Sequence, residues 1–272
     1  TTGAQVTPEG YPTSWGSVTG DYQMDPDVVG QEGRDIFDGR YADSIRDDLQ
    51  AVPTISLVMN CEDWFGSKGI YIHQSQDGTE RVMSMEFIDP ITGEDLQINC
   101  AVSMQGGISG GGTSLNRWKT FKLSMRPRFK AQTDDGTPTG GPGKLDFPLF
   151  PDSPVERHNT AVLDAVLNHS WLHPGGDQRS SAVYIQDQYI ADLHNAMGGH
   201  SPHGSYAHVY INGLYWGMYY IHERPDNAWA AQIFGGDEDD YDAVKHRGGG
   251  VIESGSGGSA SANYNAMGAA AN

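Results

Sequence analysis

Residues 208–223, HVYINGLYWGMYYIHE, decide the fold prediction. Two runs rich in aromatic and apolar residues lie on either side of Asn212-Gly213. Asparagine and glycine tolerate the positive φ angles that a two-residue hairpin turn requires. The stretch therefore predicts a β-hairpin whose second strand ends at the carboxylate of Glu223.

Alternating apolar residues predict further strands before the hairpin. Ile55, Leu57 and Met59 alternate with other residues after Pro53, and residues 82–88 and 98–104 continue this pattern. Another strand is predicted to begin at Gly69. In residues 118–125, WKTFKLSM, the period of two places Lys122 on the face opposite the apolar side chains. These patterns predict a mainly antiparallel sheet.

Helical periodicity predicts a few helices: residues 41–49, a helix from Ser180 or Ser181 to Met197 that ends at Gly198-Gly199, and a short one capped by Asp226. Asp187 falls inside the apolar stripe of the second helix. A buried charge there requires a cationic partner. The alternative is that Asp187 lies at the edge of the stripe, in water.

Composition limits the partners. The 272 residues include 17 basic and 35 acidic side chains, for a net charge of −18. This charge repels the phosphates of nucleic acids, so we expect no nucleic-acid partner. The acidic surface serves solubility alone, or it also attracts divalent cations such as Ca²⁺. We expect no membrane span, because no run reaches about 18 apolar residues. Cys61 and Cys100 form one disulfide bridge or remain two reduced thiols.

A glycine-rich segment with nearby lysines is typical of a phosphate-binding loop. Gly106, Gly107, Ser109 and Gly110 would offer backbone amides, and Lys119 or Lys122 would add a cation. A strand lysine paired with a helix acid, here Lys122 with Asp187, is how protein kinases hold nucleotide phosphates.

Together these residues resemble the CotH (spore coat protein H) kinase family, secreted or surface proteins with an atypical protein-kinase-like fold. The resemblance covers residues 54–246. It depends on the glycine-serine loop, the Lys-Thr-Phe-Lys-Leu run, the helix that contains Asp192, the hairpin, Glu223 and Lys245. It implies ATP with Mg²⁺ or another divalent cation as the cofactor and a protein as the phosphate acceptor.

The resemblance implies a role for each of four residues. Lys122 is expected to contact phosphate, Asp187 to orient Lys122, and Glu223 to close the hairpin in the site, whereas pairing with Arg224 or capping a turn is the alternative for Glu223. Lys245 corresponds to a lysine in the following strand. Members of the family continue into a segment with metal-binding aspartates, and this chain reaches a small-residue stretch instead, so we expect a C-terminally incomplete domain.

An acidic cluster and a group of histidines can each be interpreted as a metal site or as solvated surface residues. Asp237, Asp239 and Asp240 resemble a calcium loop by composition or form a solvated acidic turn. Four histidines near the hairpin raise the question of zinc, but their spacing fits no closed zinc site; they are His194, His200, His203 and His208.

We therefore predict a mixed α+β fold with three parts: an N-terminal extension (1–52), an incomplete CotH kinase-like domain (53–250) and a linker-like tail (251–272). The predicted activity of the intact protein is phosphoryl transfer from ATP to protein, in a secreted or surface location. The main alternative is a non-catalytic structural or adhesive module that contacts neighbouring surface proteins. A third is carbohydrate binding through exposed aromatic residues such as Trp216.

Overall fold

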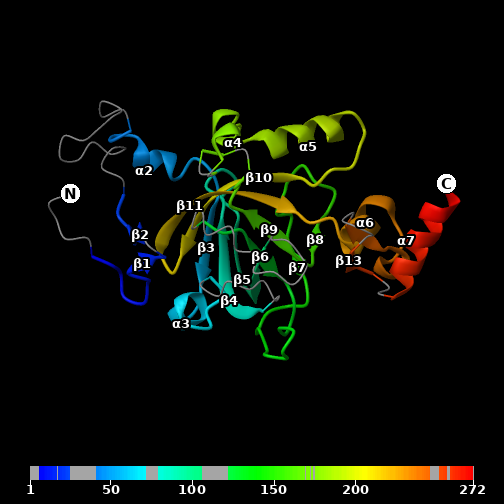
Figure 1. The fold of residues 1–272 in the computed structure, drawn as a ribbon, viewed down its shortest axis with the longest axis horizontal. Coiled ribbons are helices and arrows are strands. Elements are labelled where there is room, and N and C mark those ends of the chain that lie inside the picture. Colours follow the sequence, from blue (N-terminus) through cyan, green and yellow to red (C-terminus); the bar gives the residue numbers. More distant parts are fainter. Residues whose placement is uncertain are drawn as a thin grey trace.

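The computed structural model describes residues 6–16, 18–24, 41–71, 79–105, 122–168, 170, 171, 173, 175–245, 251–255 and 258–271. Its centre is a closed barrel of seven strands in the order β10-β11-β9-β6-β5-β4-β3 (Figure 1). These strands are β3 (Thr54–Val58), β4 (Arg81–Ile88), β5 (Asp95–Met104), β6 (Met125–Arg128), β9 (Ala161–Asp164), β10 (Gly204–Ile211) and β11 (Leu214–Glu223).

The strand pairing is antiparallel at six of the seven seams of the barrel. The seventh seam, between β3 and β10, is parallel and pairs Thr54 with His208 and Leu57 with Ile211. The prediction of a mainly antiparallel sheet with a few helices is confirmed in this broad form. The closed barrel was not predicted.

The β10–β11 hairpin forms as its sequence predicts. Asn212 has φ 48° and Gly213 has φ 81°, which are the positive angles of the tight turn that favours an Asn-Gly dipeptide. The register shifts between Val209 and Tyr210, because Val209 pairs with Gly217 and Tyr210 with Tyr215. Trp216 is therefore the extra residue of a β-bulge in β11, and bulges re-aim side chains.

Apolar side chains fill the barrel. Ile55 and Leu57 of β3 are buried, as their alternation predicts, and Cys100 and Val102 of β5 lie in the same core with Tyr219 and Ile221 of β11. Both cysteines are free thiols, Cys61 at the start of a helix and Cys100 in β5, where burial raises the thiol pKa to about 12. The alternative of a disulfide bridge is therefore wrong.

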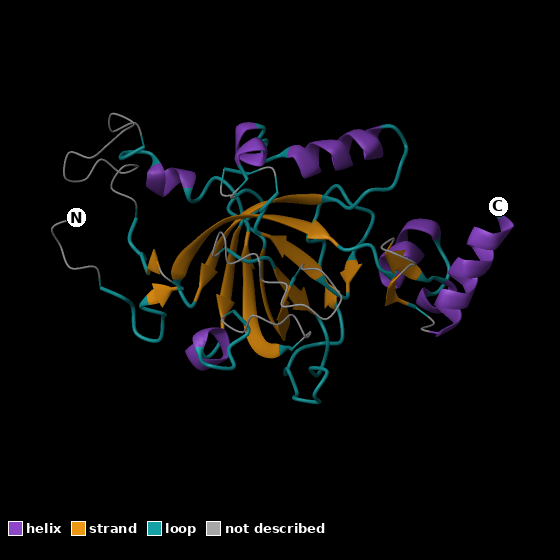
Figure 2. Ribbon diagram, viewed as in Figure 1, coloured by secondary structure: helices purple, strands orange, loops and turns teal. Residues whose placement is uncertain are grey.

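Helices and short strand pairs surround the barrel (Figure 2). The helices are α2 (Ile45–Asp48), α3 (Cys61–Phe65), α4 (Gly176–Ser180), α5 (Gln186–Ala196), α6 (Asn227–Phe234), α7 (Gly258–Ala270) and the 3-10 turn η3 (Glu238–Asp240). The small strands are β1 (Ser14–Trp15) with β2 (Val18–Thr19), β7 (Leu145–Asp146) with β8 (Arg157–His158), and β12 (Ala243–Lys245) with β13 (Val251–Ser254). Among the described residues, no helix combines the length and apolar composition that a bilayer crossing needs.

Several local predictions differ from the structure. Ile70 and Tyr71 lie in a turn rather than at the start of a strand. Lys122 precedes β6 and is not part of a strand, although Leu123 and Met125 are buried as predicted. The helix predicted from Ser180 or Ser181 to Met197 begins only at Gln186, as α5, and the separate short helix α4 ends at Ser180. The stretch expected to be linker contains α7. Asp226 does cap α6, by accepting a hydrogen bond from the Trp229 amide at 2.8 Å.

Candidate functional site

Lys122 is held against the bulged part of β11. Its Nζ donates hydrogen bonds to the Met218 carbonyl and to the Tyr184 hydroxyl, the latter at 3.2 Å. Nζ also lies 4.5 Å from the centre of the Tyr219 ring, within the range of a cation–π contact. The hairpin thus fixes the cation that the sequence singled out.

Gly217 makes this approach feasible. Its φ of +117° is a backbone conformation that residues with a side chain rarely adopt. A methyl group at this position would lie 3.3 Å from Cε and 3.6 Å from Nζ of Lys122. Glycine in the Trp-Gly-Met part of the hairpin therefore allows both the bulge and the close contact with the lysine.

Asp164 is the acidic group that acts on Lys122. It ends β9, and its Oδ1 accepts hydrogen bonds from the Ser124 hydroxyl at 3.0 Å and the Val166 amide at 2.7 Å. Burial lowers the pKa of Lys122 to about 8, and the negative charge of Asp164 opposes that shift. An ammonium with a strongly shifted pKa beside a cavity marks a candidate functional site.

Buried hydrogen bonds fix the backbone around Lys122. The Leu123 amide donates to the Tyr71 hydroxyl at 3.0 Å, and the Leu123 carbonyl accepts from the Tyr219 hydroxyl at 3.1 Å. The Tyr71 hydroxyl also accepts from Nε1 of Trp216 at 2.9 Å. The bulged tryptophan, the buried tyrosine and the lysine segment therefore form one connected unit.

A pocket of about 510 Å³ opens beside this unit. Lys122, Tyr215 and Trp216 form one part of its lining. The other part comes from the N-terminal extension and comprises Trp15, Val18, Thr19, Asp21, Tyr22, Gln23 and Met24. The cavity thus combines one cation, one carboxylate and several aromatic rings.

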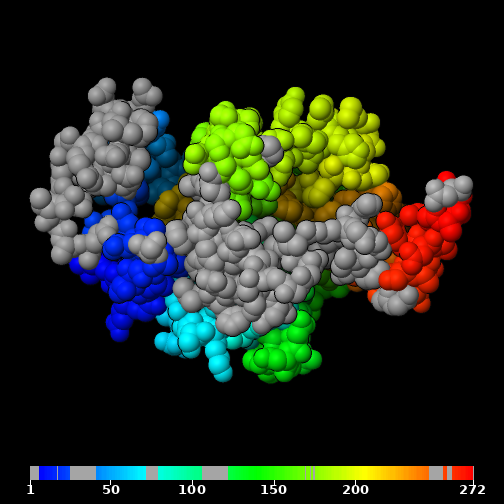
Figure 3. Space-filling view, viewed as in Figure 1, coloured from blue at the N-terminus to red at the C-terminus, as the bar shows by residue number. Residues whose placement is uncertain are grey.

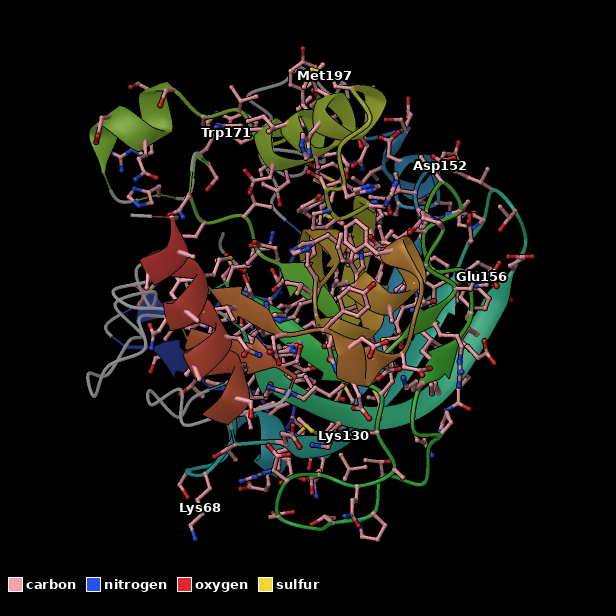
Figure 4. All side chains as sticks on the ribbon, turned by 90° about the vertical axis from the view of Figure 1, so that its right-hand side faces the viewer. Lys68, Lys130, Asp152, Glu156, Trp171 and Met197 are labelled. Carbon is pink, nitrogen blue, oxygen red and sulfur yellow. The ribbon has the colours of Figure 1, made fainter. Side chains whose placement is uncertain are left out.

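Asp187 does not lie in a core stripe. It is exposed, as are Ile190 and Leu193 of the same helix, and none of the residues of α5 is buried. Figure 4 shows Met197, just after α5, projecting from the outside of the molecule. The prediction of burial is therefore wrong, and the alternative of a solvated edge is confirmed. The proposed role of Asp187 beside Lys122 stays a prediction.

Glu223 is fully buried, and its carboxylate accepts three hydrogen bonds. Its Oε1 accepts from the Ser153 hydroxyl. Its Oε2 accepts from Nε1 of Trp229 at 2.8 Å and from the backbone amide of His203 at 2.9 Å, and Nδ1 of His203 lies 3.4 Å away. The carboxylate therefore joins the end of β11 to α6 and to the segments before β8 and β10. Its predicted site role is not tested by these contacts.

The remaining predicted residues do not gather into one site. Gly106, Gly107, Ser109, Gly110 and Lys119 lie outside the described residues, as does the side chain of Lys245, whose backbone belongs to β12.

The three aspartates predicted to bind metal, Asp237, Asp239 and Asp240, lie at the 3-10 turn η3. Asp237 and Asp240 form a reciprocal capping box around η3, and Lys144 pairs with Glu238. Within the described ranges, no group of three or more histidine, cysteine or acidic side chains is arranged to hold a metal ion. The structure therefore gives the metal prediction for Asp237, Asp239 and Asp240 no geometric support.

Residues 170–265 match the family model described as CotH kinase protein. The resemblance to the CotH family is confirmed over this segment. The CotH segment contains α4, α5, the β10–β11 hairpin, Glu223 and β12, but it does not contain Lys122. No curated protein matches the chain.

The sequence did not reveal several residues of the Lys122 environment. Tyr184 lies between two short helices, and Asp164 ends a strand that was not predicted. Gly217 stood within the hairpin motif, and an isolated glycine inside a strand pattern is a known signal for a bulge or a close approach.

Proposed function

We propose that the intact protein is a secreted or surface CotH-type kinase that transfers phosphate from ATP to protein, and that Lys122 binds the phosphates. The observation that carries this proposal is the Lys122 ammonium beside an aromatic pocket. An ammonium with a pKa of about 8 remains mostly charged at pH 7. An approaching anion favours the charged form and raises this pKa further.

In this proposal the residues of the chain have separate tasks. Lys122 donates to a phosphate oxygen, Asp164 keeps the ammonium charged, and the Tyr184 hydroxyl and the Met218 carbonyl orient it. Bound ATP supplies the phosphoryl group. The described residues offer no donor set for a divalent ion, so we assign no step to one.

A non-catalytic structural or adhesive role is the second candidate. It is favoured by Glu223, because all the contacts of this family acid hold elements of the fold together. In that role the protein contacts neighbouring surface proteins, and Lys122 serves the fold through its bonds to the Met218 carbonyl and the Tyr184 hydroxyl.

Calorimetric titration of the full chain with ATP, with and without Mg²⁺, tests the proposal against this alternative. We expect Lys122→Met to weaken ATP binding by about ten- to a hundredfold, the effect of one charge-assisted hydrogen bond. Lys68→Met is the matched control, since Lys68 is an exposed lysine that does not line this pocket (Figure 4). Wild-type affinity should also fall between pH 7 and pH 9 as Lys122 loses its proton.

Phosphate incorporation from labelled ATP then tests transfer in the same preparations. Loss of incorporation in Lys122→Met with unchanged melting would support the kinase. Absence of ATP binding by the wild-type chain would leave the structural module as the better account.

A further inference from the structure

The first part of the chain is built into the pocket wall. This arm (residues 11–16 and 18–24) lies on the side of the barrel opposite α7, in blue in Figure 3. The Tyr11 hydroxyl donates to the Ile211 carbonyl at 2.6 Å, and the Trp15 ring lies 5.9 Å from the Trp216 ring. Trp15 is only 8% exposed, so the arm is anchored to the hairpin by buried aromatic contacts.

The arm also holds its own shape. Strands β1 and β2 pair with each other, the Gly20 amide donates to the Thr13 carbonyl at 2.9 Å, and the Tyr22 hydroxyl donates to the Pro12 carbonyl at 2.6 Å. The Tyr22 ring stacks toward Trp216 at 6.5 Å with an angle of 30° between the rings. The arm therefore presents its side chains to the pocket from a defined backbone.

Most of the pocket lining belongs to this arm. It provides seven of the ten described lining residues, and the other three are Lys122, Tyr215 and Trp216. Among the described residues of that lining, Lys122 is the only basic group and Asp21 is the only acidic one. A ligand that matches these groups carries an anion at one end, and a flat ring with hydroxyl or amino donors at the other.

We propose that the arm is the specificity element of this site and binds the nucleoside part of a nucleoside polyphosphate. This inference rests on the proposed function, in which Lys122 binds the phosphates. The aromatic rings of Tyr22, Trp216 and Tyr215 offer stacking surfaces for a base, and base stacking on aromatic side chains is sequence-tolerant and strong. The Asp21 carboxylate is a suitable acceptor for sugar hydroxyls.

The segment that matches the CotH family begins at residue 170, so the arm and Lys122 both lie outside it, whereas Tyr215 and Trp216 lie inside it. In this proposal Lys122 forms the phosphate end of the site, and the arm with Tyr215 and Trp216 forms the base end. Removing a ring from the arm should weaken binding of a nucleotide and leave binding of a bare polyphosphate unchanged.

Calorimetry of the full chain with ATP and with inorganic tripolyphosphate separates these two ends. We expect the wild-type chain to prefer ATP by about tenfold or more, which corresponds to one base-stacking contact. Tyr22→Ala should reduce ATP affinity to the level of tripolyphosphate without changing tripolyphosphate affinity. Tyr22→Phe keeps the ring, and it should restore most of the preference.

The outcomes distinguish the two proposals. If Lys122→Met weakens both ligands while Tyr22→Ala changes neither, the arm has no role in specificity, and the phosphate site stands. If Tyr22→Ala weakens both ligands equally, the arm only supports the fold, and the inference is overturned. If the wild-type chain binds neither ligand, the proposed function and this inference fail together. Tyr189→Ala, at an exposed tyrosine of α5, controls for the loss of an aromatic ring.

Discussion

Replacing Glu223 separates a structural role of this residue from a catalytic one. In Glu223→Gln, the amide oxygen can occupy the position of Oε2 and still accept from the His203 amide and Trp229 Nε1. The amide nitrogen then faces the Ser153 hydroxyl, which can rotate and accept. We expect a cost of about 1 kcal/mol in the free energy of unfolding, the value of one exchanged hydrogen bond.

Glu223→Ala removes the acceptor altogether. Three donors lose their partner: Trp229 Nε1, which is buried, and the Ser153 hydroxyl and the His203 amide, which are partly buried. Each unsatisfied buried donor costs about 1–3 kcal/mol, and the serine hydroxyl can find another partner, so we expect a loss of roughly 4 kcal/mol. For a chain of this size, that lowers the melting temperature by roughly 8–16 °C.

Thermal unfolding followed by circular dichroism measures both variants, and phosphate incorporation is measured on the same samples. A Glu223→Ala variant that melts within about 2 °C of the wild type would refute the structural reasoning. A Glu223→Gln variant that melts normally but has lost all phosphate transfer would instead place Glu223 in the catalytic site, as the family resemblance implies.

Three further predictions concern the same region. Gly217→Ala should destabilise the protein by about 1–3 kcal/mol and weaken ATP binding, because the left-handed backbone is strained and the methyl group crowds Lys122; wild-type melting and affinity would contradict this. Asp164→Asn should lower the pKa of Lys122 below its value of about 8, as followed by NMR of labelled lysine, whereas Asp187→Asn should not; a larger effect of Asp187→Asn would favour the Lys122–Asp187 pair. Burial lowers the pKa of His158 below its unfolded value of about 6.5, so its contribution to stability is complete above that pH and declines as the pH falls. His158→Phe should reduce the loss of stability between pH 7 and pH 5 in urea titrations, and an unchanged pH dependence would exclude His158 as a source.

The elements that the sequence predicted well have strong local signals. The Asn212-Gly213 dipeptide specifies its turn by backbone conformation alone, and Asp226 supplies the cap of α6 within three residues. Strands β3, β4 and β5 carry alternating apolar residues because one face of each lies in the core. Such signals do not depend on where the partner strand comes from.

The features that the sequence did not reveal depend on distant parts of the chain. Periodicity marks Asp187 as part of an apolar stripe, but it does not state whether another element covers that stripe, and α5 has no buried residue. The acid that acts on Lys122 comes from β9, far along the chain from the lysine. The pocket wall comes from the N-terminal extension, whose short strands have only two residues each. Local sequence patterns cannot predict such contacts between residues that are far apart in the chain.

The parallel seam between β3 and β10 has a consequence for how the protein is made. During translation, β3 emerges long before the strand that covers its second edge, since Thr54 pairs with His208. Until the ribosome has released the hairpin, that edge exposes unpaired amides and carbonyls, which readily recruit strands from other nascent chains. We expect chains that stop before β10 to aggregate or to require chaperones, because the free edge of β3 is covered only when β10 pairs with it.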